Sequence, residues 1–466
     1  MERTRLQGHF HFVYIIKIIQ KGIVLCLVPL VQALLDFDLE SLYRALGQDA
    51  AILAALALAG GLLWGRTGYR LTDGALALER GLLVRRRSCL LRSEVAVLEQ
   101  ARPPWLRLTG ATRLTVYLAR GRGQSRATVY LPRRQAAAVA EVLLPVRSDA
   151  VLFAPTRAER MRLTMVSANL AATGALVLVS AAQTRKLFGQ GLEQRLSELT
   201  LGQLAQVERL LELVLPAGLA WLATMIFALW GLALFWSLLS TAGFRVCRSG
   251  GVILAKGGWG NHLERRIAAG AISCCEVRLT PTARLLRRRP VYLSAGSYRG
   301  GDMPVLVYKP GDEALVQALL PGFSPDPPAP GILAGRGLGL FLWKGAAGFG
   351  FFAALMGVSL WRLPQATPLL AIPLLLCLGL VLAGLEAWAT EGVSQAPGGP
   401  IAAQYTRCFT RRIVWVLTGD VSLTCRQTPF SESVGRCSLE LQLPCRLRVR
   451  VRAVKQWEAS RLKLAL

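Results

Sequence analysis

Long apolar stretches alternate with polar, strand-like segments along the whole chain. About 20 consecutive apolar residues are needed to cross a bilayer as a helix. Six stretches approach that length and fall into three pairs: 13–35 and 50–64, 161–182 and 214–239, and 338–360 and 367–389. The pattern predicts membrane α-helical hairpins, with about six transmembrane helices in all. The hairpins are 13–64, 161–239 with an amphipathic outer loop, and 338–389.

A different pattern follows each hairpin. Between 66 and 145, short runs alternate apolar with polar residues, and Gly, Pro or Asp separates them. Antiparallel strands joined by turns have this pattern, and Val95–Leu98 and Leu114–Leu118 are clear examples. The Ala-rich run 133–144 lacks Gly and follows Pro132, which predicts a helix that closes a small β-rich domain.

The strand-like pattern recurs further along the chain. Tyr308-Lys309-Pro310 repeats Tyr130-Leu131-Pro132, and Phe244-Arg245-Val246 repeats Tyr69-Arg70-Leu71. The offset stays near 177 residues, which indicates a duplication. A third, more degraded copy follows the last hairpin. The predicted β-rich domains are therefore 66–145, 241–323 and 392–466.

The first copy carries a family resemblance. Its Tyr69-Arg70-Leu71-Thr72-Asp73-Gly74 opening, its Arg80-Gly81-Leu82 turn and its Trp105-to-Gly110 segment resemble the bacterial PH-like domain of YdbT-type membrane proteins. The resemblance implies three PH-like domains, each a bent barrel with a C-terminal helix, and a role in envelope integrity or stress tolerance. The family motifs are fold signatures, so no catalytic residues are implied.

The distribution of basic residues along the chain predicts how the protein is oriented in the membrane. The chain has 55 Lys and Arg against 28 Asp and Glu, and most of the basic residues lie in the three β-rich segments. Basic segments next to membrane helices stay on the cytoplasmic side. We therefore expect a multi-pass protein of the cell inner membrane with its N-terminus and its PH-like domains cytoplasmic. The rule weakens for segments this long, so periplasmic domains remain the alternative.

Three groups of arginines are the candidate contact residues. Two are runs in the first and second domains, and one alternates along a strand of the third, which places its side chains on one face. The groups are Arg85, Arg86, Arg87; Arg287, Arg288, Arg289; and Arg446, Arg448, Arg450, Arg452. Contact with anionic lipid headgroups or an acidic partner is the functional interpretation. A solvated surface is the alternative.

Other motifs are few. Lys344 and Glu386 lie at similar depths in the third hairpin and are expected to form a structural intramembrane pair. Gly345 and Gly348 give the first helix of that hairpin a small-residue face for close packing. With three His and no CxxC pair, no metal site is expected. No nucleotide or nucleophile motif appears, so we expect neither cofactor nor enzyme activity.

These observations predict a membrane-anchored PH-like scaffold or interaction protein of the bacterial inner membrane. The expected partners are an anionic phospholipid membrane and either a second membrane protein or further copies of the chain. Nucleic acid is not expected, because few aromatics interleave with the arginines. A transporter or channel component using the hairpin bundle stays as the alternative function.

Overall fold

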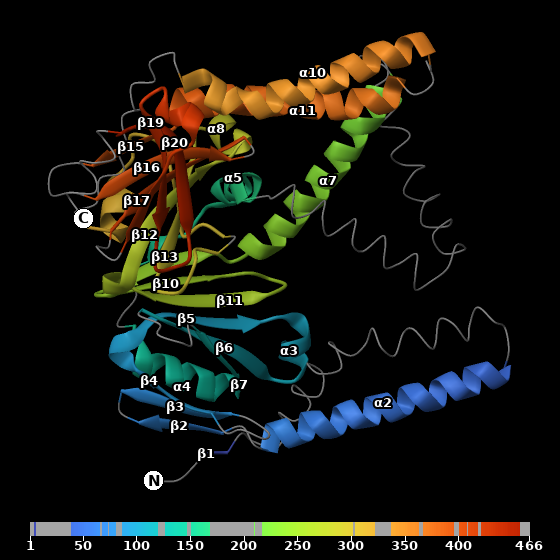
Figure 1. The fold of residues 1–466 in the computed structure, drawn as a ribbon. Helices are drawn as coiled ribbons and strands as arrows, with labels where there is room; N and C mark the ends of the chain where they lie inside the picture. The colour runs from blue at the N-terminus through green and yellow to red at the C-terminus, as the bar shows by residue number, and fades with distance from the viewer. Residues whose placement is uncertain are drawn as a thin grey trace.

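The computed structural model describes most of the chain. The described residues are 4–5, 39–65, 68–72, 74–80, 86–119, 126–146, 151–167, 209, 217–301, 303–321, 337–362, 367–395, 400–407, 409–417 and 421–456. Their strands form four antiparallel sheets, and long helices extend from one side of these sheets (Figure 1).

Domain 1 is built from two groups of three antiparallel strands with a core between them. Its elements are β2 (Gly68–Thr72), β3 (Ala75–Arg80), β4 (Arg86–Leu91), the 3₁₀ turn η2 (Arg92–Glu94), β5 (Val95–Arg102), α3 (Pro104–Leu108), β6 (Ala111–Leu118), β7 (Arg126–Pro132) and α4 (Arg133–Leu143). Leu76, Leu98 and Leu114 are fully buried in the core, and α4 adds Val139 to it. A short strand, β1 (Thr4–Arg5), extends the first sheet beside β2.

Domain 2 repeats this order. Its elements are β8 (Val151–Phe153), β9 (Arg245–Ser249), β10 (Val252–Gly257), β11 (His262–Ala268), η3 (Ala269–Ala271), β12 (Ile272–Leu279), α8 (Pro281–Leu285), β13 (Arg289–Ala295), β14 (Leu306–Tyr308) and α9 (Ala314–Leu319). The bounds of β5 and β12, and those of α3 and α8, differ by 177 residues at both ends. The repeat seen in the sequence is therefore a repeat of structure.

Domain 3 keeps the strands of the repeat. Its elements are β15 (Gly392–Gln395), β16 (Ile401–Arg407), β17 (Thr410–Val416), β18 (Ser422–Arg426), α12 (Pro429–Glu432), β19 (Arg436–Gln442) and β20 (Arg448–Lys455). Thr428 caps α12 through its side chain, as Thr280 caps α8. The range 453–466 reads as a terminal helix from sequence, but residues 453–455 belong to β20; 457–466 lie outside the described residues.

The three domains are joined edge to edge by strand pairing. Strand β5 of domain 1 pairs with β11 of domain 2, and β12 of domain 2 pairs with β17 of domain 3. The resulting seven-stranded sheet has the order β7-β6-β5-β11-β10-β9-β8, and the six-stranded sheet has the order β14-β13-β12-β17-β16-β15. Each junction is thus a continuous sheet, and the domains form one row (Figure 1).

The prediction of about six transmembrane helices is wrong for the described chain. The helices that fall in or next to the predicted hairpins are α2 (Leu39–Gly65), α5 (Arg157–Ser167), α7 (Ala217–Thr241), α10 (Leu338–Arg362) and α11 (Thr367–Thr390). Within them, only the spans Leu338–Trp361 and Pro373–Thr390 are long and apolar enough to cross a membrane. The apolar parts of α2 and α7, at Ala50–Leu62 and Phe227–Thr241, are shorter. The predicted stretches 13–35 and 168–182 lie outside the described residues.

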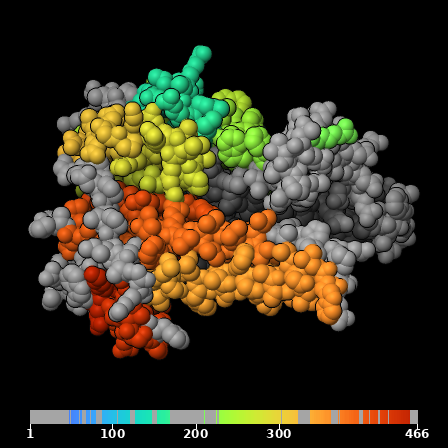
Figure 2. Space-filling model, turned by 90° about the horizontal axis from the view of Figure 1, so that it is seen from above, coloured from blue at the N-terminus to red at the C-terminus, as the bar shows by residue number. Residues whose placement is uncertain are grey.

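Helices α10 and α11 pack side by side along their length, as Figure 2 shows in orange. Small residues on α10 make this approach close. A methyl group added at Gly345 would lie 2.9 Å from the backbone nitrogen of Val381, and one at Gly348 would lie 2.9 Å from the sulfur of Cys377. The small-residue face of α10 therefore faces α11, so the close packing that the sequence predicts lies within this hairpin.

Candidate functional site: the helix-side edge of the domain row

Ion-paired carboxylates mark both domain junctions, and the second of them is buried. Glu99 of β5 lies 3.1 Å from the Arg265 guanidinium of β11. Glu276 of β12, at the same position in the repeat, lies 3.0 Å from Arg412 of β17 and 2.9 Å from Arg278 of its own strand. Because a buried charge needs a partner, these ion pairs fix which domain faces which.

A short helix follows each junction strand and touches the next domain. Arg107 of α3 donates a hydrogen bond of 2.7 Å to the carbonyl oxygen of Trp259, in the turn between β10 and β11. Arg284 of α8 donates one of 2.8 Å to the carbonyl oxygen of Phe409, in the turn between β16 and β17. The two contacts are equivalent, since Arg107 and Arg284 are 177 residues apart.

Both contacts lie among apolar side chains that face outward. The exposed fraction is 90% for Leu108 and 84% for Leu285, the residues that follow the two arginines. Trp259 is 69% exposed and Phe409 is 40% exposed. We call these six residues the helix-side edge: Arg107, Leu108, Trp259, Arg284, Leu285 and Phe409. Large exposed apolar side chains grouped in this way are typical of a contact surface.

The helix-side edge lies where the apolar helices meet the β domains. The backbone nitrogen of Trp259 donates a hydrogen bond of 2.8 Å to the carbonyl of Leu239 in α7. A methyl group added at Gly379 of α11 would lie 3.3 Å from the Phe409 ring. Figure 1 shows α3 and α8 on the side from which α2, α7, α10 and α11 extend. The same side of the row therefore presents both the helices and these exposed side chains.

The two predicted arginine runs lie in different surroundings. Arg85 and the side chain of Arg86 are outside the described parts of the chain. Arg87, in the edge strand β4, is 74% exposed and lies 3.1 Å from Glu79. Arg287 and Arg288 form the turn after α8, directly beside the helix-side edge. Arg289 lies 6.0 Å from the centre of the Tyr308 ring.

The alternating arginines divide into two groups. Arg446, Arg448 and Arg450 are exposed, and buried apolar residues alternate with them. Arg452 instead binds Glu391 at 2.7 Å, and the Glu391 side chain is only 1% exposed. Burial raises the pKa of Glu391, and the hydrogen bond from Arg452 opposes that rise. Arg452 therefore ties β20 to the end of α11.

The predicted pair between Lys344 and Glu386 is not formed. Glu386 of α11 forms an ion pair with Arg284 of α8, and Lys344 lies 5.5 Å from the centre of the neighbouring Trp343 ring. The sequence shows that two helices run antiparallel but not that a β domain lies against one of them. Glu386 thus joins the second domain to the third hairpin.

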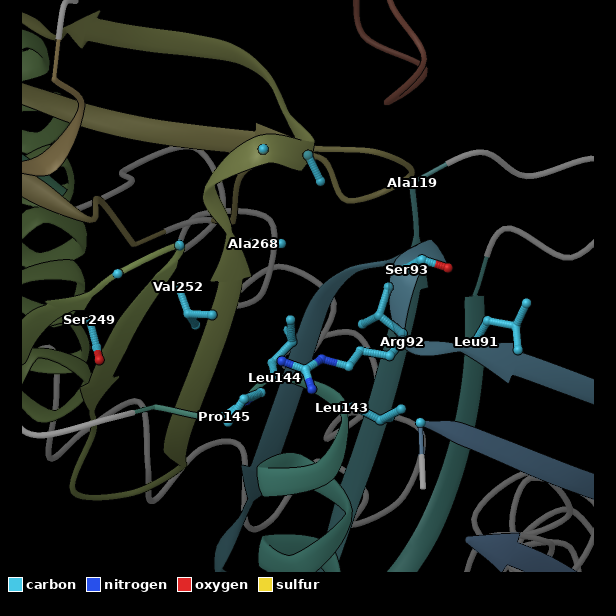
Figure 3. A pocket seen from close by; sticks show the side chains of 16 residues that line it. Leu91, Arg92, Ser93, Ala119, Leu143, Leu144, Pro145, Ser249, Val252 and Ala268 are labelled. Atoms are coloured by element: carbon cyan, nitrogen blue, oxygen red, sulfur yellow. The ribbon is translucent and has the colours of Figure 1, made fainter. Parts of the chain in front are cut away.

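A cleft of about 900 Å³ lies between domains 1 and 2, and sequence reasoning missed it. Figure 3 shows its walls, which come from η2, the end of α4, the β9–β10 turn and the region of η3. Among the described residues that line the cleft, most are small or apolar, such as Leu143, Leu144 and Val252, and Arg92 alone is charged. The Ser249-Gly250-Gly251 turn is its only sequence signal. In the part of the chain that the structure describes, no group of His, Cys, Asp and Glu has the arrangement of a metal site.

The comparison with known families concerns the first domain of the row. Residues 24–147 match the family model of the bacterial PH domain. That range contains α2 and all of domain 1, so the chain carries a bacterial PH domain over these residues. The resemblance inferred from Tyr69 to Gly110 is thereby confirmed at the level of this family. No curated protein and no solved structure matches the chain.

Proposed function

We propose that the protein is a membrane-anchored scaffold of the bacterial inner membrane, with no catalytic role. In this proposal, hairpin α10–α11 anchors the chain and the row of domains lies against the bilayer surface through the helix-side edge. The observation that carries the proposal is the repetition of one cluster, Arg-Leu on a short helix beside an exposed aromatic residue, at both domain junctions.

The chemistry of the edge favours a lipid interface. Burying an exposed Leu side chain contributes roughly 1.5–3 kcal/mol, and a basic residue near an anionic surface contributes about 1 kcal/mol. Trp is the residue most suited to the headgroup region, because its ring is apolar and its N–H can bond to water. Arg287 and Arg288, next to α8, would meet anionic phospholipid headgroups.

We also propose an orientation in the membrane, which the same arrangement supports. Because the helices and the edge share one side of the row, all three domains would lie on one membrane face. The basic composition favours the cytoplasmic face, with the N-terminus there as well. Held at that face, the domains would gather a partner membrane protein by raising its effective concentration and would support envelope integrity.

A spin label placed on the edge tests this proposal. Full-length protein with Cys89→Ser is labelled at Leu108→Cys or Leu285→Cys and placed in nanodiscs with and without anionic lipid. Leu91, which is 47% exposed and lines the cleft, provides the matched control position. Labelled protein without the added cysteine corrects for the remaining thiols.

The expected result is high oxygen accessibility at positions 108 and 285, as in the acyl region, and high accessibility to a water-soluble relaxant at 91. Anionic lipid should strengthen the difference, and replacing Arg287 and Arg288 with Gln should reduce that gain. Equal exposure of all three labels to water would refute a lipid-facing edge.

A further inference from the structure

In the described part of the chain, the row of domains ends in two strands that each have a neighbour on one side only, and their counterparts inside the chain have neighbours on both sides. Strand β4 occupies in domain 1 the position that β11 and β17 occupy in domains 2 and 3. Strand β18 occupies in domain 3 the position of β5 and β12. Within the described residues, β4 pairs with β3 alone and β18 pairs with β19 alone.

Exposure shows that each terminal edge lacks the neighbour that its counterparts have. Cys89 of β4 is exposed, whereas Arg266 and Trp415, the residues at its position in β11 and β17, are 5% and 2% exposed. On β18, Thr424 is exposed, whereas Glu276 at its position in β12 is 1% exposed. The alternation of exposed and half-buried residues along β18 is that of an edge strand.

We propose that β18 of one copy pairs with β4 of a second copy, so that the protein assembles head to tail. The occupant of each free edge is a second copy of this chain, because the contact repeats the two junctions inside the chain. This head-to-tail assembly is a property beyond lipid contact, and the proposal does not depend on lipid contact.

The internal junctions define the register of this pairing. Val97 pairs with Ile267 in the first junction, and Cys274 pairs with Val416 in the second. The 177-residue offset places Leu90 at the position of Ile267. The pairs Cys274↔Ser294 and Ser422↔Gln442 place Ser422 at the position of Cys274. Ser422 should therefore lie opposite Leu90, and Thr424 opposite Ser88.

Charge at the two ends is complementary. At the position of Arg107 and Arg284, the short helix α12 carries Glu432, which is exposed. In the internal junctions this position contacts the turn that precedes the paired strand. In the proposed contact that strand is β4, which begins with Arg86 and Arg87. At this end the short helix therefore carries an acidic residue in place of the arginine, and the strand that would face it begins with two arginines.

The geometry suits copies in one membrane. Domains 1 and 3 lie at opposite ends of the row, and the helices leave the row on one side (Figure 1). Continuing the row by another domain step keeps the helices of the second copy on that side. Because the contact uses two different surfaces, it generates either a closed ring or an open chain of copies.

Directed disulfide formation tests the contact in native membranes. Two full-length variants, both with Cys89→Ser, are coexpressed with different tags: one carries Ser88→Cys and the other Thr424→Cys. Residues directly opposite in antiparallel strands have Cα separations compatible with a disulfide. We expect a mixed covalent dimer only on coexpression, and a ladder of multimers from a chain that carries both cysteines. Arg448→Cys, an exposed position on β20, replaces Thr424→Cys in the matched control and should give no dimer with Ser88→Cys.

Charge reversal provides the second measurement. Glu432→Arg should reduce the cross-linked fraction about tenfold, because like charges then meet, and Arg87→Glu in the other chain should restore it. Asp312→Arg, an exposed acidic residue in domain 2, is the control. Absence of the mixed dimer, or a dimer from Ser88→Cys alone, would overturn the proposal. The first outcome would mean that β18 and β4 of different copies do not pair, and the second that β4 of one copy pairs with β4 of another.

Discussion

The second domain junction should depend on the Glu276 carboxylate. Its side chain is 2% exposed and contacts Arg412 at 3.0 Å and Arg278 at 2.9 Å. Glu276→Gln keeps the shape of the side chain but removes its charge, which leaves two guanidinium groups without a carboxylate. Removing one partner of a buried ion pair costs about 3–5 kcal/mol.

The expected cost at this site is smaller than that range. The side chains of Arg278 and Arg412 are 18% and 23% exposed, so both can recover part of their hydration. Arg278 also keeps its position 4.0 Å from the centre of the Tyr292 ring. We therefore expect a loss of roughly 2 kcal/mol in the free energy of opening the junction, which is below the range for a fully buried pair.

Hydrogen exchange on full-length protein in nanodiscs measures this loss. A chain of several domains does not unfold in one step, so a local readout is needed. A loss of 2 kcal/mol speeds the exchange of β17 amides about 30-fold. Glu79→Gln, which affects the exposed pair with Arg87, should change exchange in β4 by less than about threefold. A change in β17 no larger than this control would refute the reasoning.

Three further predictions concern the junctions. Burial, and then Arg102, lowers the pKa of His262 below its usual 6.5. The unfolded chain then binds the proton first as pH falls, so stability should drop below about pH 6.5 in a thermal scan, and His262→Gln should flatten that dependence. Gly296→Val should loosen domain 1 from domain 2, seen as faster proteolysis, because a methyl group there would lie 2.3 Å from the Leu118 carbonyl oxygen. Arg284→Gln should speed exchange at the end of α11, since it removes the ion pair with Glu386.

The strands and their repetition could be predicted from sequence because both depend on local signals. Alternation of apolar and polar residues identifies a strand, and a Gly or Pro identifies its end. The 177-residue offset then carries the assignment from β5 to β12. In domain 3 the same signals predict the strands, but residues 453–455 continue β20 instead of starting a helix.

The junctions between domains could not be predicted by the same reasoning, although two signals were present. The run Val95-Ala96-Val97-Leu98 is apolar on both faces, as in a strand with neighbours on each side. Glu99 follows that run, and Glu276 recurs at the repeat offset within an equally apolar strand. Together they indicate a buried carboxylate that needs a basic partner from elsewhere.

Contacts between residues distant in sequence also limited how much of the candidate site could be predicted. Four alternating arginines form one pattern, but only the structure shows that Arg452 binds Glu391, a residue 61 positions away. Glu386 likewise binds a side chain of another domain.

The length of the apolar stretches alone overstated the number of membrane spans. Helix α5 covers the start of one predicted span, yet it begins at Arg157 and includes Glu159, Arg160 and Arg162.

One arrangement of strands accounts for both proposals. Because α3 and α8 directly follow β5 and β12, the pairing that joins two domains also brings an arginine to the next hairpin turn and exposes the leucine beside it. The helix-side edge is therefore a product of the domain row and has one cluster for each junction. If β18 pairs with β4 of another copy, that new junction places α12 beside the start of β4, where Glu432 gives an acidic contact in place of an Arg-Leu cluster. Assembly would then extend the row without adding a third lipid-facing cluster, so lipid affinity per copy should stay constant as the assembly grows.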